Sequence, residues 1–189
     1  MNIGVLALQG DFQEHIDILG NLGVSASEIR NAQDLKANFD GIILPGGEST
    51  VMSRLLQELN MVTDLQQIIK SGVPVFGTCA GLILLAKDIE GNEKSCLNVM
   101  DVKVKRNGYG RQLASFKAEG ALNGKTVPLV FIRAPYITAV GDKVKILVQV
   151  EDKIVAARED NMLATSFHPE LTRDFTVHKL FLDMIREKI

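Results

Sequence analysis

The chain has 189 residues, 46% of them hydrophobic, which fits a single domain spanning residues 1–189 with a full core. A formal net charge of −2 gives no basis for nucleic-acid binding, and no apolar run reaches the length of a membrane span. The first residues lack the basic region of a signal peptide, and two cysteines argue against a disulfide scaffold. We therefore expect a cytoplasmic protein.

The first half of the chain alternates strands and helices. Ile3–Leu8 predicts a strand, followed by a helix that Asp11 caps and Gly23 closes. Apolar residues recur at helical spacing in that helix, at Phe12, Ile16, Leu19 and Leu22. Val24–Ile29 and Gly41–Leu44 predict a second and a third strand. This alternation favours a parallel sheet with helices on both faces.

Two more helices precede the centre of the chain. After Pro45, Ser49 or Thr50 is expected to cap a helix, and Leu65–Lys70 predicts another, ended by Gly72. The apolar face of the first of these helices comprises Met52, Leu55, Leu56 and Leu59. The pattern predicts an α/β, flavodoxin-like three-layer sandwich with a mainly parallel central sheet.

The second half adds an antiparallel region, because strand-like segments follow Ile89 without a long helix between them. These segments are Val99–Lys105, Leu113–Glu119, Val127–Ile132, Val144–Val150 and Ile154–Arg158. Asp152-Lys153 is expected to form the hairpin turn between the last two. Met162–Phe167 is expected to return to the main sheet, and Phe175–Lys188 to form a closing helix.

Cys79 lies at a predicted strand-to-helix turn within Val73–Ala86. Gly77 and Gly81 flank it, which gives the thiol version of a nucleophile elbow. The positive end of the following helix favours the thiolate. Taken alone, a buried cysteine is more often a small hydrophobic residue.

A second segment supplies what a thiol nucleophile needs. His168 can accept the proton, and Glu170 can hold the imidazole in the required tautomer. The separation from Cys79 (168 − 79 = 89 residues) is no objection, because triad members meet in space. The joint pattern predicts a catalytic Cys-His-Glu triad. Cys96, outside any elbow, is expected to be inert, and the other two histidines, at 15 and 178, to be structural or on the surface.

The Pro-Gly-Gly turn that begins at Pro45 follows a buried strand, where ligands bind in an open parallel sheet. The backbone N–H groups of Gly47 and Ala80 suit an oxyanion hole, although an ordinary strand-to-helix turn is an equal reading. Arg106 follows a strand of alternating polarity and Arg133 follows an apolar run, and arginine suits recognition of a carboxylate. No metal-ligand spacing is present, so neither a metal nor another cofactor is expected.

Six segments in this order resemble a known family. They are Gly4–Gly10, Leu44–Thr50, Phe76–Gly81, Arg106–Gln112, Phe131–Pro135 and Ser166–Thr172. Together they resemble the glutaminase subunits of pyridoxal 5'-phosphate synthase, a family of class I (triad) glutamine amidotransferases. The resemblance spans essentially the whole chain.

The resemblance implies hydrolysis of L-glutamine to glutamate and ammonia, with Cys79 as nucleophile and His168 and Glu170 completing the triad. It implies glutamine contacts from residues of three segments, namely Gly47, Glu48, Ser49, Arg106, Ile132 and Arg133. It also implies a partner, a (β/α)₈-barrel synthase subunit in a ring-shaped hetero-oligomer that receives the ammonia. The first helix, including Glu14 and His15, is implied as a docking element.

Three positions depart from the family pattern, namely Asn98, Lys105 and Ala114. Asn is the residue that best tolerates a left-handed backbone, so the turn at Asn98 is expected to form. None of the three is a triad position, and their expected effect is on contacts with the partner.

Other functions stay open from the sequence. An amidotransferase of another pathway is one, although Arg106–Gln112 and Phe131–Pro135 argue against it. A stand-alone thiol hydrolase is a second, but that group places its His soon after the Cys, whereas here none occurs between Cys79 and His168. A regulatory subunit with a dead triad is a third, and the presence of all three triad residues argues against it.

Overall fold

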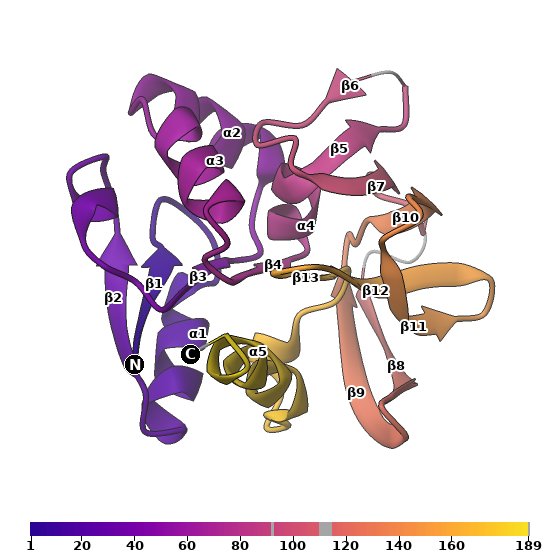
Figure 1. Cartoon of the computed structure of the whole chain (residues 1–189). Helices are drawn as coiled ribbons and strands as arrows, with labels where there is room; N and C mark the ends of the chain where they lie inside the picture. The colour runs from indigo at the N-terminus through magenta and orange to yellow at the C-terminus, as the bar shows by residue number, and fades with distance from the viewer. Residues whose placement is uncertain (92, 110–114, 189) are drawn as a thin grey trace.

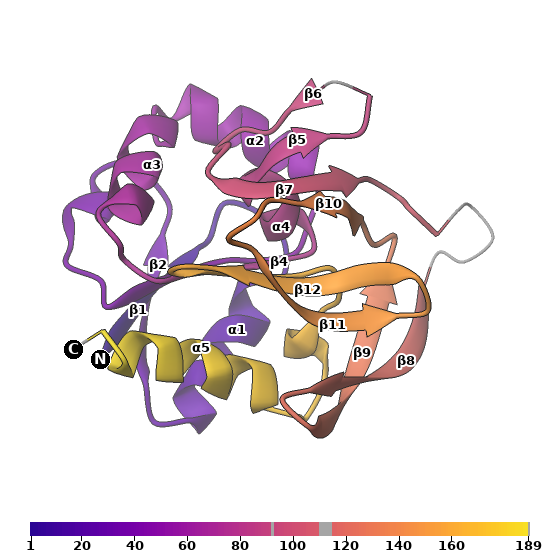
Figure 2. The same cartoon turned by 45° about the vertical axis from the view of Figure 1, so that its right-hand side comes forward.

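The computed structural model describes residues 1–91, 93–109 and 115–188, and it has a central sheet with helices on both faces (Figure 1). The helices are α1 (Phe12–Asn21), α2 (Ser49–Glu58), α3 (Val62–Lys70), α4 (Ala80–Leu85) and α5 (Thr176–Arg186), with 3₁₀ turns η1 (Asp34–Lys36) and η2 (Pro169–Leu171). α1 and α5 lie on one face, and α2, α3 and α4 lie on the other (Figures 1 and 2).

The strands of the first half form the parallel part of this sheet. They are β1 (Asn2–Leu6), β2 (Ser25–Ile29), β3 (Gly41–Leu44) and β4 (Val75–Thr78), joined by β13 (Met162–Thr165) from near the end of the chain. Their order is β2-β1-β3-β4-β13, with every neighbouring pair parallel. All residues of β3, β4 and β13 are buried, because helices cover both faces. The predicted flavodoxin-like α/β class is confirmed.

The second half supplies the antiparallel region. Its strands are β5 (Ala86–Ile89), β6 (Glu93–Lys94), β7 (Met100–Lys105), β8 (Ser115–Leu122), β9 (Lys125–Ile132), β10 (Tyr136–Val140), β11 (Lys145–Val150) and β12 (Lys153–Glu159). The central sheet continues from β13 as β12-β10-β7-β5-β6, with β11 on β12, and β8 and β9 pair as a separate ribbon. Figure 2 shows this ribbon beside β11 and β12, and β8 packs against β11. The predicted antiparallel region is therefore present.

Several local predictions in this region need correction. β5, β6 and β10 were not predicted, since β5 directly continues α4 and β10 directly follows Pro135. The hairpin turn is Glu151-Asp152, one residue earlier than expected, because Val150 pairs with Lys153 and Glu151 takes the positive φ of +52°. Asn98 has φ +51°, the left-handed conformation expected there. Of the predicted segments, residues 113 and 114 lie outside the described residues.

Helix starts also differ from the sequence prediction. α2 has Glu48 at its N-cap position, so neither Ser49 nor Thr50 caps it. Asp11 does hold the N-cap position of α1, but its side chain makes no capping hydrogen bond. In the part of the chain that the structure describes, no helix has the length and apolar character needed to cross a membrane.

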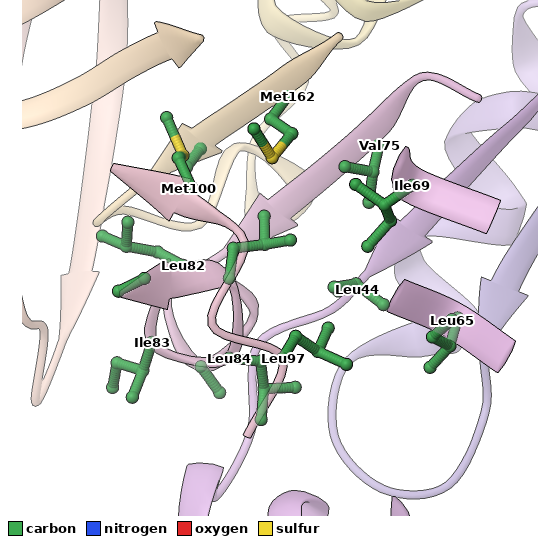
Figure 3. Close-up of a cluster of buried hydrophobic side chains, with 14 of the residues drawn as sticks. Leu44, Leu65, Ile69, Val75, Leu82, Ile83, Leu84, Leu97, Met100 and Met162 are labelled. Atoms are coloured by element: carbon green, nitrogen blue, oxygen red, sulfur yellow. The ribbon is translucent and has the colours of Figure 1, made fainter. Parts of the chain in front are cut away.

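Apolar side chains fill the space on both faces of the sheet. Beneath α3 and α4 they form the cluster drawn in Figure 3, which includes Leu44, Leu65, Ile69, Val75, Leu82 and Leu84. Beneath α1 and α5 a second cluster contains Ile3, Leu19, Phe76 and Phe181. Because both faces are packed, the carboxyl ends of β3, β4 and β13 are held at one edge of the sheet, where polar residues follow each strand.

Two helical glycines give a matched test of this packing. A Cβ on Gly81 would lie 2.0 Å from the Leu44 carbonyl oxygen, whereas a Cβ on the exposed Gly20 of α1 would meet nothing within 4 Å. Gly81→Ala should therefore destabilise the fold by about 1–3 kcal/mol through overpacking. Gly20→Ala should stabilise it by about 0.5–1 kcal/mol because alanine is the better helix former. Urea denaturation of both variants measures this difference, and equal shifts would contradict it.

Candidate active site

Cys79 stands on a strained turn between β4 and α4. Its backbone has φ +48° and ψ −96°, a conformation that non-glycine residues rarely adopt. The turn is tight, because a Cβ on Gly77 would lie 2.7 Å from the Gly81 carbonyl carbon. The Cys79 N–H donates to the Thr165 carbonyl at 2.8 Å, which ties the turn to β13. The predicted elbow geometry is therefore present, with Cys79 6% exposed.

β13 brings the second segment beside this turn. It runs parallel to β4, with Thr165 opposite Thr78, so the chain that follows leaves the sheet next to Cys79. The His168 N–H donates to the Val130 carbonyl of β9 at 2.8 Å, and Glu170 lies in η2. His168 Nδ1 lies 2.7 Å from Glu170 Oε1, with both side chains buried.

His168 has a second carboxylate neighbour. Asp11 Oδ2 lies 3.2 Å from His168 Nδ1, which explains why Asp11 does not cap α1. The opposite ring nitrogen, Nε2, is buried and has no hydrogen-bond partner of standard geometry among the described residues. The Cys79 side chain also interacts with this imidazole. One ring nitrogen thus faces two carboxylates, while the other is left for the thiol or a reacting group.

These contacts decide the charge of His168. Burial acts to lower the pKa of His168, but its interactions with Asp11, Cys79 and Glu170 and the charge of Glu170 outweigh burial and raise that pKa well above its usual value. Burial raises the pKa of Glu170, while the hydrogen bond from His168 acts to lower it. The imidazole can therefore keep a proton at neutral pH beside the thiol.

A pocket of about 350 Å³ opens over Cys79 and His168. Its wall comes from the β1–α1 loop, the turn after β3, the elbow and α4, the segment after β7, the end of β9 and the segment after β13. The residues are Asp11, Gly47, Glu48, Ser49, Cys79, Ile83, Arg106, Asn107, Ile132, Arg133 and His168. All six side chains and backbone positions expected to contact substrate are in that wall. Asn107 and Arg133 have φ of +47° and +42°, so backbone strain gathers around this pocket.

The turn after β3 is held by the loop after β1. The Gly46 carbonyl accepts a hydrogen bond from the Asp11 N–H at 3.0 Å, and the Glu48 N–H donates to Gln9 Oε1 at 2.7 Å. Gly47 has φ +153°, and a Cβ on Gly46 would lie 2.3 Å from His168 Cε1. These glycines let the turn pass directly against the His168 ring.

The two backbone N–H groups expected to stabilise an oxyanion belong to Gly47 and Ala80. Gly47 lines the pocket, and Ala80, just after the elbow, is 1% exposed and outside the pocket wall. As the first residue of α4, Ala80 has an N–H without an intrahelical acceptor. Their role as an oxyanion hole stays a prediction.

Sequence reasoning missed the buried polar residues behind the triad. His15 and His178 are both fully buried and contact each other. Thr78 contacts His15 and Glu170. None of His15, His178 and Thr78 was assigned a part in the site from the sequence. The signal for His15 is helical spacing, because it shares the inward face of α1 with Ile18 and Leu19. His15 is buried and Glu14 is exposed, so of these two residues only Glu14 is accessible to a docked partner, and docking through the first helix stays a prediction.

Asp11, His168 and Glu170 are also the one described group whose ligand atoms approach within 4.8 Å of one another, as in a metal site. The 2.7 Å contact between His168 and Glu170 is a hydrogen-bond distance, so a shared proton accounts for it without an ion. The expectation of a reaction without a metal stays a prediction.

Comparison with known proteins places this chain in a family. A model of the SNO glutamine amidotransferase family matches residues 5–187. Pyridoxal 5'-phosphate synthase subunit PdxT of Methanocorpusculum labreanum is 59% identical over 186 residues, covering 98% of both chains. The Streptococcus pneumoniae protein of the same name is 53% identical over 192 residues, covering 100% of this chain and 99% of the relative.

Solved structures agree with this result. A crystal structure of a glutamine amidotransferase superposes with a TM-score of 0.92 at 41% identity, covering 97% of this chain and 98% of the other. A putative GMP synthase subunit from Thermoplasma acidophilum, at 16% identity and a TM-score of 0.71, shares the fold. The chain belongs to the SNO glutamine amidotransferase family.

Proposed function

We propose that this protein is the glutaminase subunit of a pyridoxal 5'-phosphate synthase, a single cytoplasmic glutaminase domain spanning residues 1–189. It hydrolyses L-glutamine to L-glutamate and ammonia through Cys79, His168 and Glu170, and the ammonia passes to a synthase subunit. The observation that carries the proposal is the 2.7 Å His168–Glu170 pair beside the Cys79 elbow, at the floor of a pocket of about 350 Å³. The full-length likeness to PdxT relatives supports the pathway.

The pocket wall offers charges that suit the substrate. Glutamine has an α-carboxylate and an α-ammonium group at one end and the reacting amide at the other. Arg106 and Arg133 bind the carboxylate, and Glu48 binds the ammonium group, with all three in the wall that contains Cys79. Ser49 and Ile132 complete the contacts, so the side-chain amide is directed toward the sulfur.

Acylation begins when the Cys79 thiolate attacks the amide carbon and forms a carbon–sulfur bond. The amide oxygen becomes an oxyanion, which the Gly47 and Ala80 N–H groups stabilise. His168, which keeps its proton because its carboxylate neighbours raise its pKa, donates that proton to the departing nitrogen. The carbon–nitrogen bond breaks, ammonia leaves, and a γ-glutamyl thioester remains on Cys79.

Deacylation uses the same residues in reverse. The now neutral His168 takes a proton from a water molecule, which attacks the thioester carbon. The carbon–sulfur bond breaks, glutamate leaves, and the Cys79 thiolate and His168 imidazolium are restored. Glu170 holds the imidazole in the tautomer that presents Nε2 to the reacting groups, and no redox or metal step is required.

The partner is a (β/α)₈-barrel synthase subunit in a ring-shaped hetero-oligomer, and it controls activity. Gly47 lies on a glycine turn whose Gly46 carbonyl is held by the Asp11 N–H at the start of α1. A partner that contacts the exposed face of α1, including Glu14, would act on that turn and hence on the oxyanion hole. Activity conditional on assembly limits waste of glutamine and loss of ammonia to solvent.

The nucleophile assignment predicts that Cys79→Ala lowers glutamine hydrolysis by at least about a thousandfold, because no thioester can form. A thiol-directed glutamine analogue should label Cys79 and spare Cys96, since burial raises the pKa of the Cys96 thiol. Mass spectrometry of the labelled peptides measures this, with Cys96→Ala as the matched control that keeps its activity. Labelling confined to Cys96 together with loss of activity would overturn the assignment.

The two carboxylates at His168 make a second prediction. Asp11→Asn should lower the pKa of His168, because a carboxylate that favours the imidazolium is lost while Glu170 remains. The readout is the pH titration of the His168 ring by NMR. Asp17→Asn is the control, since it removes the same charge from α1 at an exposed residue bonded to Gln13. An unchanged His168 titration in Asp11→Asn, or an equal shift in Asp17→Asn, contradicts the electrostatic argument.

Gating by the partner predicts that the isolated subunit releases ammonia from glutamine slowly and that adding the synthase subunit raises this rate. A coupled ammonia assay with and without the partner measures the ratio. Equal rates would remove the gating idea and leave the triad standing.

A further inference from the structure

Behind Glu170 lies a chain of buried polar side chains that the proposed reaction does not use. His15 Nε2 lies 3.6 Å from Glu170 Oε2 and 3.2 Å from Thr78 Oγ1, and Thr78 Oγ1 lies 3.5 Å from Glu170 Oε1. His15 Nδ1 in turn lies 3.0 Å from His178 Nε2. The chain joins α1, β4, η2 and α5, and its histidines are 0% exposed.

Both histidines are neutral. Burial, followed by the neighbouring His178 and His168, holds the pKa of His15 well below its usual value. Burial also lowers the pKa of His178 to about 4. The Phe76 ring stands edge-on to both imidazoles, with ring centres 6.0 Å and 5.7 Å away, so the surroundings are apolar. Each ring therefore has one N–H donor and one acceptor nitrogen.

The contacts select the tautomers. If His15 carried its proton on Nδ1, it would donate to His178 Nε2, and the His178 proton would sit on Nδ1, which is buried without a partner. The lone pair of His15 Nε2 would then face the carboxylate oxygen of Glu170, a repulsive contact.

The opposite tautomer assignment gives more of the buried polar groups a hydrogen-bond partner. With Nε2–H on both rings, His178 donates to His15 Nδ1, and the bare His178 nitrogen is an acceptor, which costs less to leave unpaired than a donor would. His15 Nε2–H donates to Thr78 Oγ1 and points its positive end toward Glu170 Oε2, leaving the Thr78 hydroxyl free to donate to Oε1. Both oxygens of the buried carboxylate then face a donor.

We infer that His15 and His178, as neutral Nε2–H tautomers, are positioning residues that orient Glu170 and keep it ionised: His178 fixes the His15 tautomer, and His15 supports the carboxylate. The inference rests on the proposed function, because the carboxylate affects turnover only if Cys79, His168 and Glu170 form the triad. Among the described residues, Glu170 Oε2 is buried with no hydrogen-bond partner of standard geometry, and His15 Nε2 lies 3.6 Å from it. A buried carboxylate that loses such support becomes protonated or rotates away. Either change removes the acceptor of the His168 Nδ1 proton.

The test compares four full-length chains assembled with the synthase subunit, with L-glutamine as substrate. His15→Leu removes the donor and keeps an apolar side chain of similar size. It should lower kcat by about 10- to 100-fold, the loss expected when a buried charged group loses a nearby donor, with little change in KM. His15→Gln places an amide donor near the Nε2 position and should recover most of that loss.

Phe181→Leu is the matched control. The Phe181 side chain lies on α5 in the same apolar cluster as Phe76, with its ring centre 5.6 Å from that of Phe76. It makes no polar contact with the buried polar side chains behind Glu170. Even when it lowers Tm as much as His15→Leu does, Phe181→Leu should leave kcat near that of the unsubstituted protein. If Phe181→Leu lowers kcat as much as His15→Leu, or if His15→Gln recovers nothing, the role is structural and the inference fails.

A second measurement does not depend on turnover. The chain has three histidines, so nitrogen NMR of the labelled protein resolves each ring. His15 and His178 should both give the Nε2–H signature between pH 6 and 8. The His168 ring is faced by Asp11, Cys79 and Glu170 and, through Glu170, by His15, and its titration midpoint should fall in His15→Leu and stay unchanged in Phe181→Leu.

The outcomes separate the two proposals. If the unchanged complex releases no ammonia from glutamine, the proposed function fails, and the NMR midpoint of His168 alone decides whether His15 supports Glu170. If the complex is active and His15→Leu keeps the same kcat and the same His168 midpoint, the positioning role is overturned and the glutaminase stands. An Nδ1–H or charged His15 also overturns it.

Discussion

The pairing of β4 with β13 is the constraint on which the site depends. These strands are far apart in sequence, yet Thr78 lies opposite Thr165 in a parallel register. The Cys79 N–H then bonds to the Thr165 carbonyl at 2.8 Å, and the chain beyond β13 must turn beside the thiol. A slip of one residue would send each side chain of β13 to the other face of the sheet. Register, rather than any single side chain, therefore brings His168 to Cys79.

The buried carboxylate shows why the surrounding polar residues are needed. An isolated ionised group in a protein interior is strongly unfavourable unless hydrogen bonds and opposite charge compensate for lost water. Glu170 obtains that compensation from His168 and Thr78 at Oε1 and from His15 near Oε2. The same arrangement explains the partly exposed Asp11, which adds a second acceptor for His168 without the full cost of burial.

Much of this arrangement was predictable from the sequence, because it rests on local patterns. Alternating apolar runs indicated the parallel half, and the glycines around Cys79 indicated an elbow, since both are fixed by backbone geometry. His15 and His178 were harder to interpret, because a histidine on an apolar helix face has no sequence feature that shows what it will meet. Their meeting depends on how α1 and α5 pack against β4, which is a property of the tertiary structure.

The presence of the antiparallel region was predicted, but the pairing of its strands was not, for a different physical reason. In the first half, the βαβ alternation determines which strands are neighbours in the sheet. The second half lacks that alternation, so its strand order depends on tertiary contacts. Yet β9 contributes directly to the site: the Val130 carbonyl accepts the His168 N–H, and the Ile132 carbonyl lies 3.9 Å from the Cys79 sulfur. Arg133 follows at once with φ +42°, a strained backbone held in the pocket wall. His168 follows β13 of the parallel part and pairs with Glu170 there, while its backbone N–H is anchored to β9 of the antiparallel region. The register of β13 therefore brings the imidazole beside the thiol, and β9 fixes its backbone in that place.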